Sequence, residues 1–142
     1  MILSAIFFVG LDRAIKVYSL VYPGNFRFIG NILKFNPVEN KNIAFSLPLS
    51  GIWLEVIIAF TIIFLTYILI NLIKKQAFAQ ACFLLFVILG AASNLYDRIF
   101  FGGVIDYLDL RYFTVFNLAD VMIVSGALAL ALSVHRNGQK NP

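Results

Sequence analysis

Residues 52–73 read IWLEVIIAFTIIFLTYILINLI, and Glu55 is their single charged residue. About 20 mostly apolar residues are enough to cross a bilayer as a helix. Lipid offers the backbone no hydrogen-bonding partners, so a spanning segment of this kind must be helical. Three other stretches meet the same requirement: residues 1–21, 77–96 and 116–134. We therefore predict an all-α membrane protein with four transmembrane helices, which forms a single domain over residues 1–142.

The composition of the chain supports this class and excludes others. Hydrophobic residues make up 61% and charged residues 13% of the chain, whereas soluble domains are about half apolar and about a quarter charged. The net charge of +4 is scattered and forms no basic stripe, so we expect no nucleic-acid partner. Cys82 and His135 are the only cysteine and histidine. We therefore expect no metal site and no cofactor.

The first apolar stretch, residues 1–21, differs from a secretory signal peptide. It lacks a basic start, it has no clear cleavage site, and Asp12, Arg13 and Lys16 lie in its second half. We expect a retained span. Asp12 and Lys16 are four positions apart and share a helix face, which leaves two hypotheses open. They form either a structural ion pair or a contact with substrate.

The segment between the first two spans, residues 22–51, is too polar to cross the membrane. Within it, residues 26–35 alternate aromatic and basic side chains around Gly30-Asn31, a pair that favours a two-residue turn. We predict a small hairpin that lies at the membrane surface. Lys and Arg are balanced between the two sides of the predicted bundle, so charge alone does not orient the chain.

Polar residues at the end of the third span are costly in a membrane and need partners. Asn94, Asp97 and Arg98 share one helix face, and the adjacency of Asp97 and Arg98 permits mutual neutralisation. Gly102-Gly103 then ends the helix. We expect Asp106 to follow on an irregular segment that lines a cavity near the membrane surface.

The fourth span carries Asn117 and Asp120 on one face within its first turn. No basic residue lies near Asp120 on its own helix, and Asp106 is expected at the same depth. Two carboxyl groups in a low-dielectric pocket share one proton, so that one can act as a base and the other as an acid. The other interpretation of Asp106 and Asp120 is structural: helix capping, or a hydrogen-bond network with Asn and Arg side chains.

Five short blocks together resemble the lipoprotein signal peptidases, the type II signal peptidases of bacteria. GVIDY at 103–107 is similar to the family's G-x-V-x-D-F block, and FNLAD at 116–120 is similar to F-N-x-A-D. The other three resemble G-N-x-x-D-R, N-x-G-A-A-F and D-Q-x-[ST]-K, and they are NLYDR at 94–98, NKNIAF at 40–45 and DRAIK at 12–16. The blocks occur in the family's order along nearly the whole chain.

The resemblance implies an aspartic endopeptidase of the bacterial inner membrane. It implies cleavage of a prolipoprotein before a cysteine that carries diacylglycerol, with cytoplasmic termini and an active site at the outer leaflet. Asp106 and Asp120 would be the catalytic pair. Substrate binding or orientation of the pair falls to Asn40, Asn94, Arg98 and Asn117. Structural support falls to Asp12, Lys16 and Asp97. Expected partners are the lipidated precursor and membrane lipid, and the protein is expected to be a monomer.

The chain also departs from the family's pattern. The departures are Arg13, Ile15, Asn42, Ile43 and Ser93. They keep a non-catalytic lipoprotein-binding paralogue as an alternative. A second alternative is a small proton- or ion-relay transporter subunit, although its carboxylates should be spread through the membrane depth. Here Asp97, Asp106, Asp109 and Asp120 all fall on one side of the predicted bundle.

Overall fold

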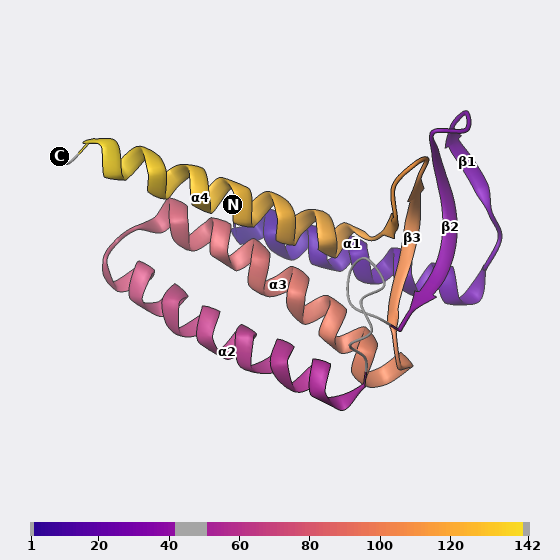
Figure 1. The fold of residues 1–142 in the computed structure, drawn as a ribbon, viewed down its shortest axis with the longest axis horizontal. Coiled ribbons are helices and arrows are strands. Elements are labelled where there is room, and N and C mark those ends of the chain that lie inside the picture. The colour runs from indigo at the N-terminus through magenta and orange to yellow at the C-terminus, as the bar shows by residue number, and fades with distance from the viewer. Residues whose placement is uncertain (1, 42–50, 141–142) are drawn as a thin grey trace.

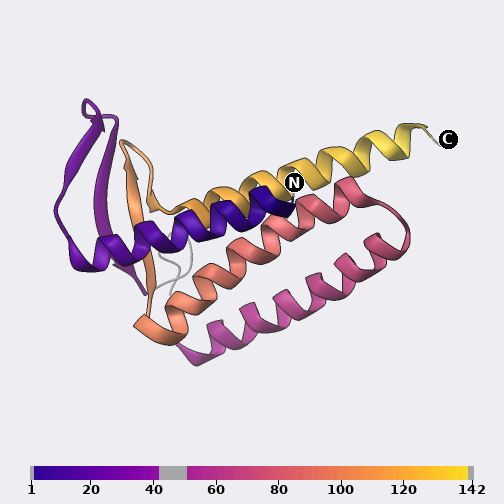
Figure 2. The ribbon, with the colours of Figure 1, turned by 180° about the vertical axis from the view of Figure 1, so that it is seen from behind.

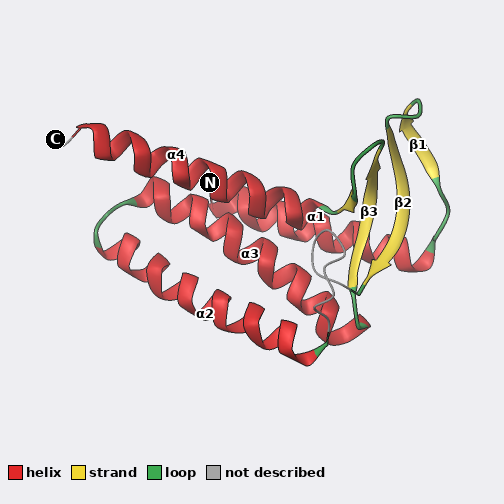
Figure 3. Ribbon diagram, in the orientation of Figure 1, coloured by secondary structure: helices red, strands yellow, loops and turns green. Residues whose placement is uncertain are grey.

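The structure is a computed structural model that describes residues 2–41 and 51–140. In these residues a helical bundle carries a small antiparallel sheet at one end (Figures 1 and 3). The helices are α1 (Ile2–Val21), α2 (Ile52–Lys74), α3 (Phe78–Phe101) and α4 (Leu118–Lys140). The strands are β1 (Phe26–Ile29), β2 (Leu33–Asn40), β3 (Val104–Leu110) and β4 (Val115–Phe116).

Three of the described helices are long and apolar enough to cross a membrane: α2, α3 and residues 118–136 of α4. The first predicted span is helical as expected. However, α1 carries Asp12, Arg13 and Lys16, so its composition does not place it with the other three. Its N-terminal end lies beside the middle of the bundle, and its other end reaches the sheet (Figure 2). Three of the four expected spans are therefore supported by length and composition. The span expected over residues 1–21 stays a prediction.

Among the described helices, α3 and α4 make the most extensive contact, and two glycines allow their backbones to approach. A Cβ atom at Gly90 would lie 2.6 Å from the carbonyl oxygen of Ala119. A Cβ atom at Gly126 would lie 2.7 Å from the carbonyl oxygen of Phe83. Small residues let membrane helices approach closely. This contact holds the start of α4 against the middle of α3, at Gly90.

The sheet has the strand order β1-β2-β3-β4, with antiparallel pairing throughout. The predicted hairpin of β1 and β2 is present. Its turn has three residues between the paired Ile29 and Leu33, not the two expected. Gly30 takes a positive φ of 48°, and the Ile32 N–H donates to the Ile29 carbonyl oxygen at 2.9 Å.

The segment after α3 is a strand, so the prediction of an irregular segment around Asp106 is wrong. The helix ends at Gly102, which has φ 79° in the left-handed region, and β3 then pairs with the whole of β2. A break in register between Phe35 and Val38 accommodates Pro37, which cannot donate to a ladder. Asp106 is therefore held by a sheet ladder.

Candidate active site

Asn117 lies immediately before α4 and forms a reciprocal cap with Asp120. Its Oδ1 accepts from the Asp120 N–H at 2.9 Å, and its own N–H donates to Asp120 Oδ2 at 3.1 Å. A capping box of this kind satisfies two of the free amides at a helix start. Asn117 is thus a capping residue, and its predicted place on the face of the fourth helix is wrong, because α4 begins at Leu118.

The side chain of Asn117 also reaches Asp106 on β3. Its Nδ2 donates to Asp106 Oδ1 at 2.7 Å and to Asn94 Oδ1 at 3.1 Å. The amide is therefore fixed in one orientation, with oxygen toward α4 and nitrogen toward Asp106. Through this one residue, Asp106 and Asp120 acquire a common partner.

Asp106 is 3% exposed, and both of its carboxyl oxygens have side-chain donors. Asn40 Nδ2 donates to Oδ2 at 3.0 Å, across the β2–β3 ladder in which Asn40 pairs with Val104. Burial raises the pKa of Asp106 to about 6, and the nearby charge of Asp120 adds to the rise. The hydrogen bonds from Asn40 and Asn117 lower it. The pKa of Asp106 is thus closer to neutral pH than that of an ordinary carboxyl group, as is typical of a group that exchanges protons in catalysis.

Asp120 lies in the first turn of α4 and is partly exposed. Its Oδ1 accepts from Asn94 Nδ2 at 2.8 Å, while Oδ2 serves the cap of Asn117. Both structural roles considered for Asp120, capping and an amide network, are therefore realised. Asp106 shares Asn117 as a partner with Asp120, and the charge of Asp120 contributes to the raised pKa of Asp106. The two structural roles therefore orient the Asp120 carboxyl group near Asp106.

Lys16 anchors this network from α1. It is fully buried, and its Nζ contacts Asp12 Oδ2 at 3.0 Å, Asp97 Oδ2 at 2.8 Å and Asn94 Oδ1 at 2.8 Å. An ammonium group has three N–H donors, and three acceptors surround this one. The predicted Asp12–Lys16 ion pair is confirmed. Because Lys16 donates to Asn94 Oδ1, the amide of Asn94 presents its nitrogen to Asp120.

Asp97 forms ion pairs with two residues of α1, in addition to a longer-range electrostatic interaction with its neighbour Arg98. Arg13 Nη2 contacts Asp97 Oδ1 at 2.5 Å, and Lys16 contacts Oδ2. The Arg13 guanidinium also lies 4.9 Å from the centre of the Tyr96 ring. Adjacent residues on a helix point in different directions, which lets Asp97 face α1. The charge that Arg13 adds to α1 is thus matched by Asp97.

Arg98 points instead toward the end of β2. Its Nη1 donates to the Lys41 carbonyl oxygen at 3.4 Å, and the residue is 8% exposed. Of the block at 40–45, Asn40 and Lys41 belong to the described residues. Asn42, Ile43, Ala44 and Phe45 lie outside them.

Two polar contacts of the site were not foreseen from the sequence. Tyr107 is 2% exposed, and its hydroxyl donates to Asp12 Oδ1 at 3.1 Å. Ser93, noted only as a departure from glycine, donates to Asp12 Oδ2 at 2.7 Å. The available signal was a tyrosine directly after Asp106, because a phenol that is buried needs a hydrogen-bond partner.

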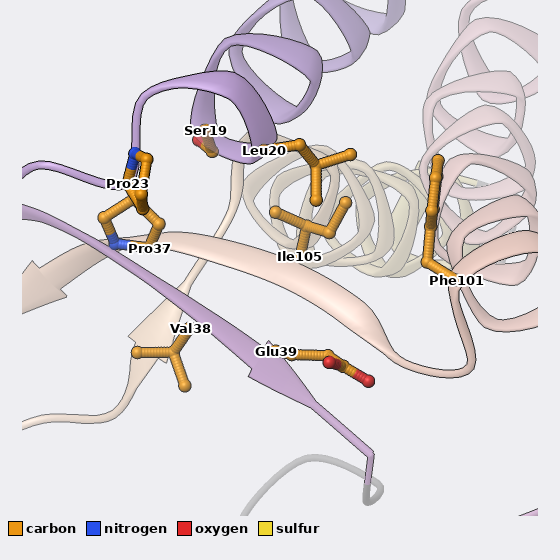
Figure 4. A pocket seen from close by; sticks show the side chains of 8 residues that line it. All are labelled: Ser19, Leu20, Pro23, Pro37, Val38, Glu39, Phe101 and Ile105. Atoms are coloured by element: carbon orange, nitrogen blue, oxygen red, sulfur yellow. The ribbon is translucent and has the colours of Figure 1, made fainter.

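Among the described residues, two cavities lie near the sheet, and neither Asp106 nor Asp120 is among the residues that line them. One of about 340 Å³ is lined by residues at the end of α1, by residues of β2 that include Glu39, and by Phe101 and Ile105 (Figure 4). Another of about 250 Å³ has aromatic walls that include Phe26, Phe35 and Tyr107. Within residues 2–41 and 51–140, no group of three or more His, Cys, Asp or Glu residues could hold a metal ion.

Three of the described helices are apolar and long enough to cross a membrane. At one end of the bundle, amide side chains hold the buried Asp106 and the partly exposed Asp120. These features define a multi-pass membrane protein with an enzyme-like polar site. The family model for signal peptidase (SPase) II matches residues 4–136. The chain belongs to this family and is a peptidase of a bacterial membrane.

Named relatives agree with this assignment. The lipoprotein signal peptidase of Clostridioides difficile is 34% identical over 138 residues, which cover 94% of this chain and 93% of the relative. The lipoprotein signal peptidase of Syntrophomonas wolfei is 35% identical, with 96% of this chain and 93% of the relative covered.

A solved bacterial membrane enzyme has the same fold, with a TM-score of 0.84 and 22% identity over 99% of this chain and 90% of that one. A second solved bacterial membrane enzyme gives a TM-score of 0.77 at 24% identity, over 94% of this chain and 90% of that one.

Proposed function

We propose that this protein is an aspartic endopeptidase that removes the signal peptide from diacylglyceryl-modified prolipoproteins, cutting before the lipidated cysteine. Asp106 and Asp120 are the catalytic residues. The observation that carries this assignment is the bridge made by Asn117, which donates to one oxygen of each carboxyl group. Family membership and the named lipoprotein signal peptidases support the substrate class.

The chemistry follows from a pair that holds one proton. The ionised carboxylate takes a proton from water as the water oxygen attacks the scissile carbonyl carbon. The protonated carboxyl group gives its proton to the carbonyl oxygen. Collapse of the resulting gem-diol breaks the C–N bond. One of its hydroxyl groups returns a proton to the second carboxylate as the new carbonyl forms, and the departing nitrogen takes a proton from the first carboxyl group. The pKa of about 6 for Asp106 suits such exchange near neutral pH.

The residues around Asp106 and Asp120 have three proposed roles: they orient the carboxyl groups, contact the substrate, or stabilise the site through ion pairs. Asn40, Asn94 and Asn117 donate hydrogen bonds to the catalytic carboxyl groups and orient them. Arg98, at the end of α3, contacts the substrate backbone. Asp12, Lys16 and Asp97 form the ion-pair network beneath.

The proposed setting is the bacterial inner membrane, with the sheet end at the outer leaflet, cytoplasmic termini and a monomeric enzyme. In this setting α1 also crosses the membrane, which brings the number of spans to the four predicted from the sequence. The lipidated cysteine of an exported precursor lies at the outer leaflet. Asp106 and Asp120 lie at the sheet end of the bundle and so would meet the precursor there.

The decisive experiment replaces each carboxyl group by its amide. Asp106→Asn and Asp120→Asn should each reduce cleavage of a purified diacylglyceryl-modified precursor by at least about a thousandfold, because an amide cannot exchange the proton. Asp109→Asn is the matched control. Asp109 lies on the same strand as Asp106, and its Oδ2 accepts a hydrogen bond from Asn36 Nδ2 at 3.1 Å. Because Asp109 has no role in the proposed mechanism, Asp109→Asn should still cleave the precursor.

Two outcomes would overturn the proposal. Substantial cleavage by either amide variant would remove the aspartic mechanism. A folded parent protein that binds the lipidated precursor without cleaving it would favour the non-catalytic paralogue. Activity should also survive chelators, and loss of activity that zinc restores would contradict a metal-independent mechanism.

A further inference from the structure

The first turn of α4 carries Asp120, and its free backbone amides all have side-chain acceptors. A helix start leaves four N–H groups without partners in the helix. The N–H groups of Asn117 and Asp120 are satisfied by the reciprocal cap described above. The two others are satisfied from outside α4. The Leu118 N–H donates to the Tyr107 hydroxyl at 3.1 Å, and the Ala119 N–H donates to Asp12 Oδ1 at 3.2 Å.

The Tyr107 hydroxyl has a fixed direction in this arrangement. It accepts from the Leu118 amide and donates to Asp12 Oδ1 at 3.1 Å. Burial, followed by the negative charge of Asp12, raises the pKa of Tyr107 above its ordinary value, so the hydroxyl keeps its proton. The ring is 2% exposed and packs beside Phe35, with the ring centres 6.1 Å apart. The hydroxyl therefore has little freedom to move.

Tyr107 also joins the two elements that carry the proposed catalytic groups. It follows Asp106 directly on β3. Its hydroxyl accepts a hydrogen bond from the N–H of Leu118, the first residue of α4, which lies two positions before Asp120. A phenylalanine at this position, as in the G-x-V-x-D-F block that the segment resembles, would have no acceptor for the Leu118 amide. This part-buried amide would lose its hydrogen bond, which is costly wherever water cannot replace the lost acceptor.

We propose that the Tyr107 hydroxyl is a positioning group that fixes the start of α4, and with it Asp120, relative to Asp106. The inference rests on the proposed function for its effect on catalysis. Tyr107 does not itself exchange protons with substrate. It acts through the Leu118 amide and Asp12.

Tyr107→Phe removes only the hydroxyl and is the first test. Misplacement of one carboxyl group should lower kcat about tenfold, as expected for loss of about 1.4 kcal/mol of transition-state stabilisation. KM should change less than about twofold. Tyr112→Phe is the same substitution at a side chain that is 91% exposed and should match the parent. A Tyr107→Phe enzyme with the parent's kcat would overturn the proposal.

A second variant tests the contact itself. Leu118 is the first residue of α4, where proline is tolerated because its missing N–H has no partner within the helix. Leu118→Pro therefore deletes the donor that Tyr107 receives, and Leu118→Ala controls for the lost side chain. If the hydroxyl acts through this amide, adding Tyr107→Phe to Leu118→Pro should lower kcat less than about twofold further. Multiplying losses would overturn the proposal.

Hydrogen exchange separates this inference from the proposed function. In Tyr107→Phe the Leu118 amide should exchange at least about tenfold faster than in the parent and in Tyr112→Phe. This readout needs no cleavage. A parent that cleaves no precursor yet shows the faster exchange in the variant would overturn the proposed function and retain the contact. Unchanged exchange would overturn the contact whatever the activity.

Discussion

Asn117 shows how much one side chain can determine at this site. Its amide oxygen caps α4, its amide nitrogen holds Asp106, and its backbone amide holds Asp120. A rotation that exchanged the amide nitrogen and oxygen would place oxygen against the Asp106 carboxylate and nitrogen against a backbone donor. The hydrogen-bond pattern therefore permits one orientation, and the relative position of the two carboxyl groups follows from it.

The pKa of Asp106 leads to a prediction at the scale of a single hydrogen bond. The pH profile of kcat/KM should contain a limb with an apparent pKa near 6, which belongs to the coupled pair. The Asn40 side chain stabilises the carboxylate. Asn40→Ala should therefore shift this limb upward by about one pH unit. Asn36→Ala, which removes a bond to Asp109 instead, should leave it in place. An unchanged or lowered limb in Asn40→Ala would contradict the assignment.

At the scale of elements, the contact between α3 and α4 places the amides that orient Asp120. Asn94 lies one helical turn after Gly90, on the side of α3 that meets the start of α4. Lys16 on α1 fixes the amide of Asn94 from behind. The position of the Asp120 carboxyl group thus depends on α1, α3 and α4. A small separation of α3 from α4 would lengthen the hydrogen bond between Asn94 and Asp120.

Gly90→Ala tests this packing. The added methyl group would lie 2.6 Å from the Ala119 carbonyl oxygen, so the helices must separate, at a cost of about 1–3 kcal/mol. We expect cleavage to fall at least about tenfold and the thermal midpoint to fall with it. At Gly10 nothing lies within 4 Å of such a methyl group, so Gly10→Ala is the matched control and should behave like the parent. Equal activity of the two variants would show that the contact does not position Asp120.

At the scale of the whole molecule, the sheet and the α2–α3 turn lie at opposite ends of the bundle (Figure 1). The site lies at the sheet end, with the cap of α4. Charge does not orient the chain, because basic residues occur at both ends. The side on which the site faces therefore follows from the proposed substrate and has to be measured.

Cysteine labelling in intact bacteria measures this orientation. In a Cys82→Ala background, a thiol reagent that cannot cross the bilayer should label Asn31→Cys in the hairpin. It should not label Lys75→Cys in the turn after α2 until the cells are opened. Labelling of Lys75→Cys alone would put the carboxyl pair on the cytoplasmic side, where no lipidated cleavage site is available. That result would favour the transport alternative.

Much of the fold was predictable from local patterns. The helices near 52–73, 77–96 and 116–134, the hairpin around Gly30 and the end of α3 at Gly102-Gly103 all follow from runs of apolar residues or from glycine. The importance of Asp106 and Asp120 was also readable, because a carboxyl group in an apolar surrounding needs a partner. Their catalytic role stays a prediction until it is measured.

Other features were decided only by the tertiary structure. Residues 104–110 became a strand because β2 supplied a ladder. Asp97 turned to Arg13 and Lys16, which are more than 80 positions away, and the Tyr107 hydroxyl found Asp12 and Leu118. The physical reason is range. A sequence pattern reports neighbours within about one helical turn, whereas buried hydrogen bonds and ion pairs are settled by whichever partners packing brings within about 3 Å.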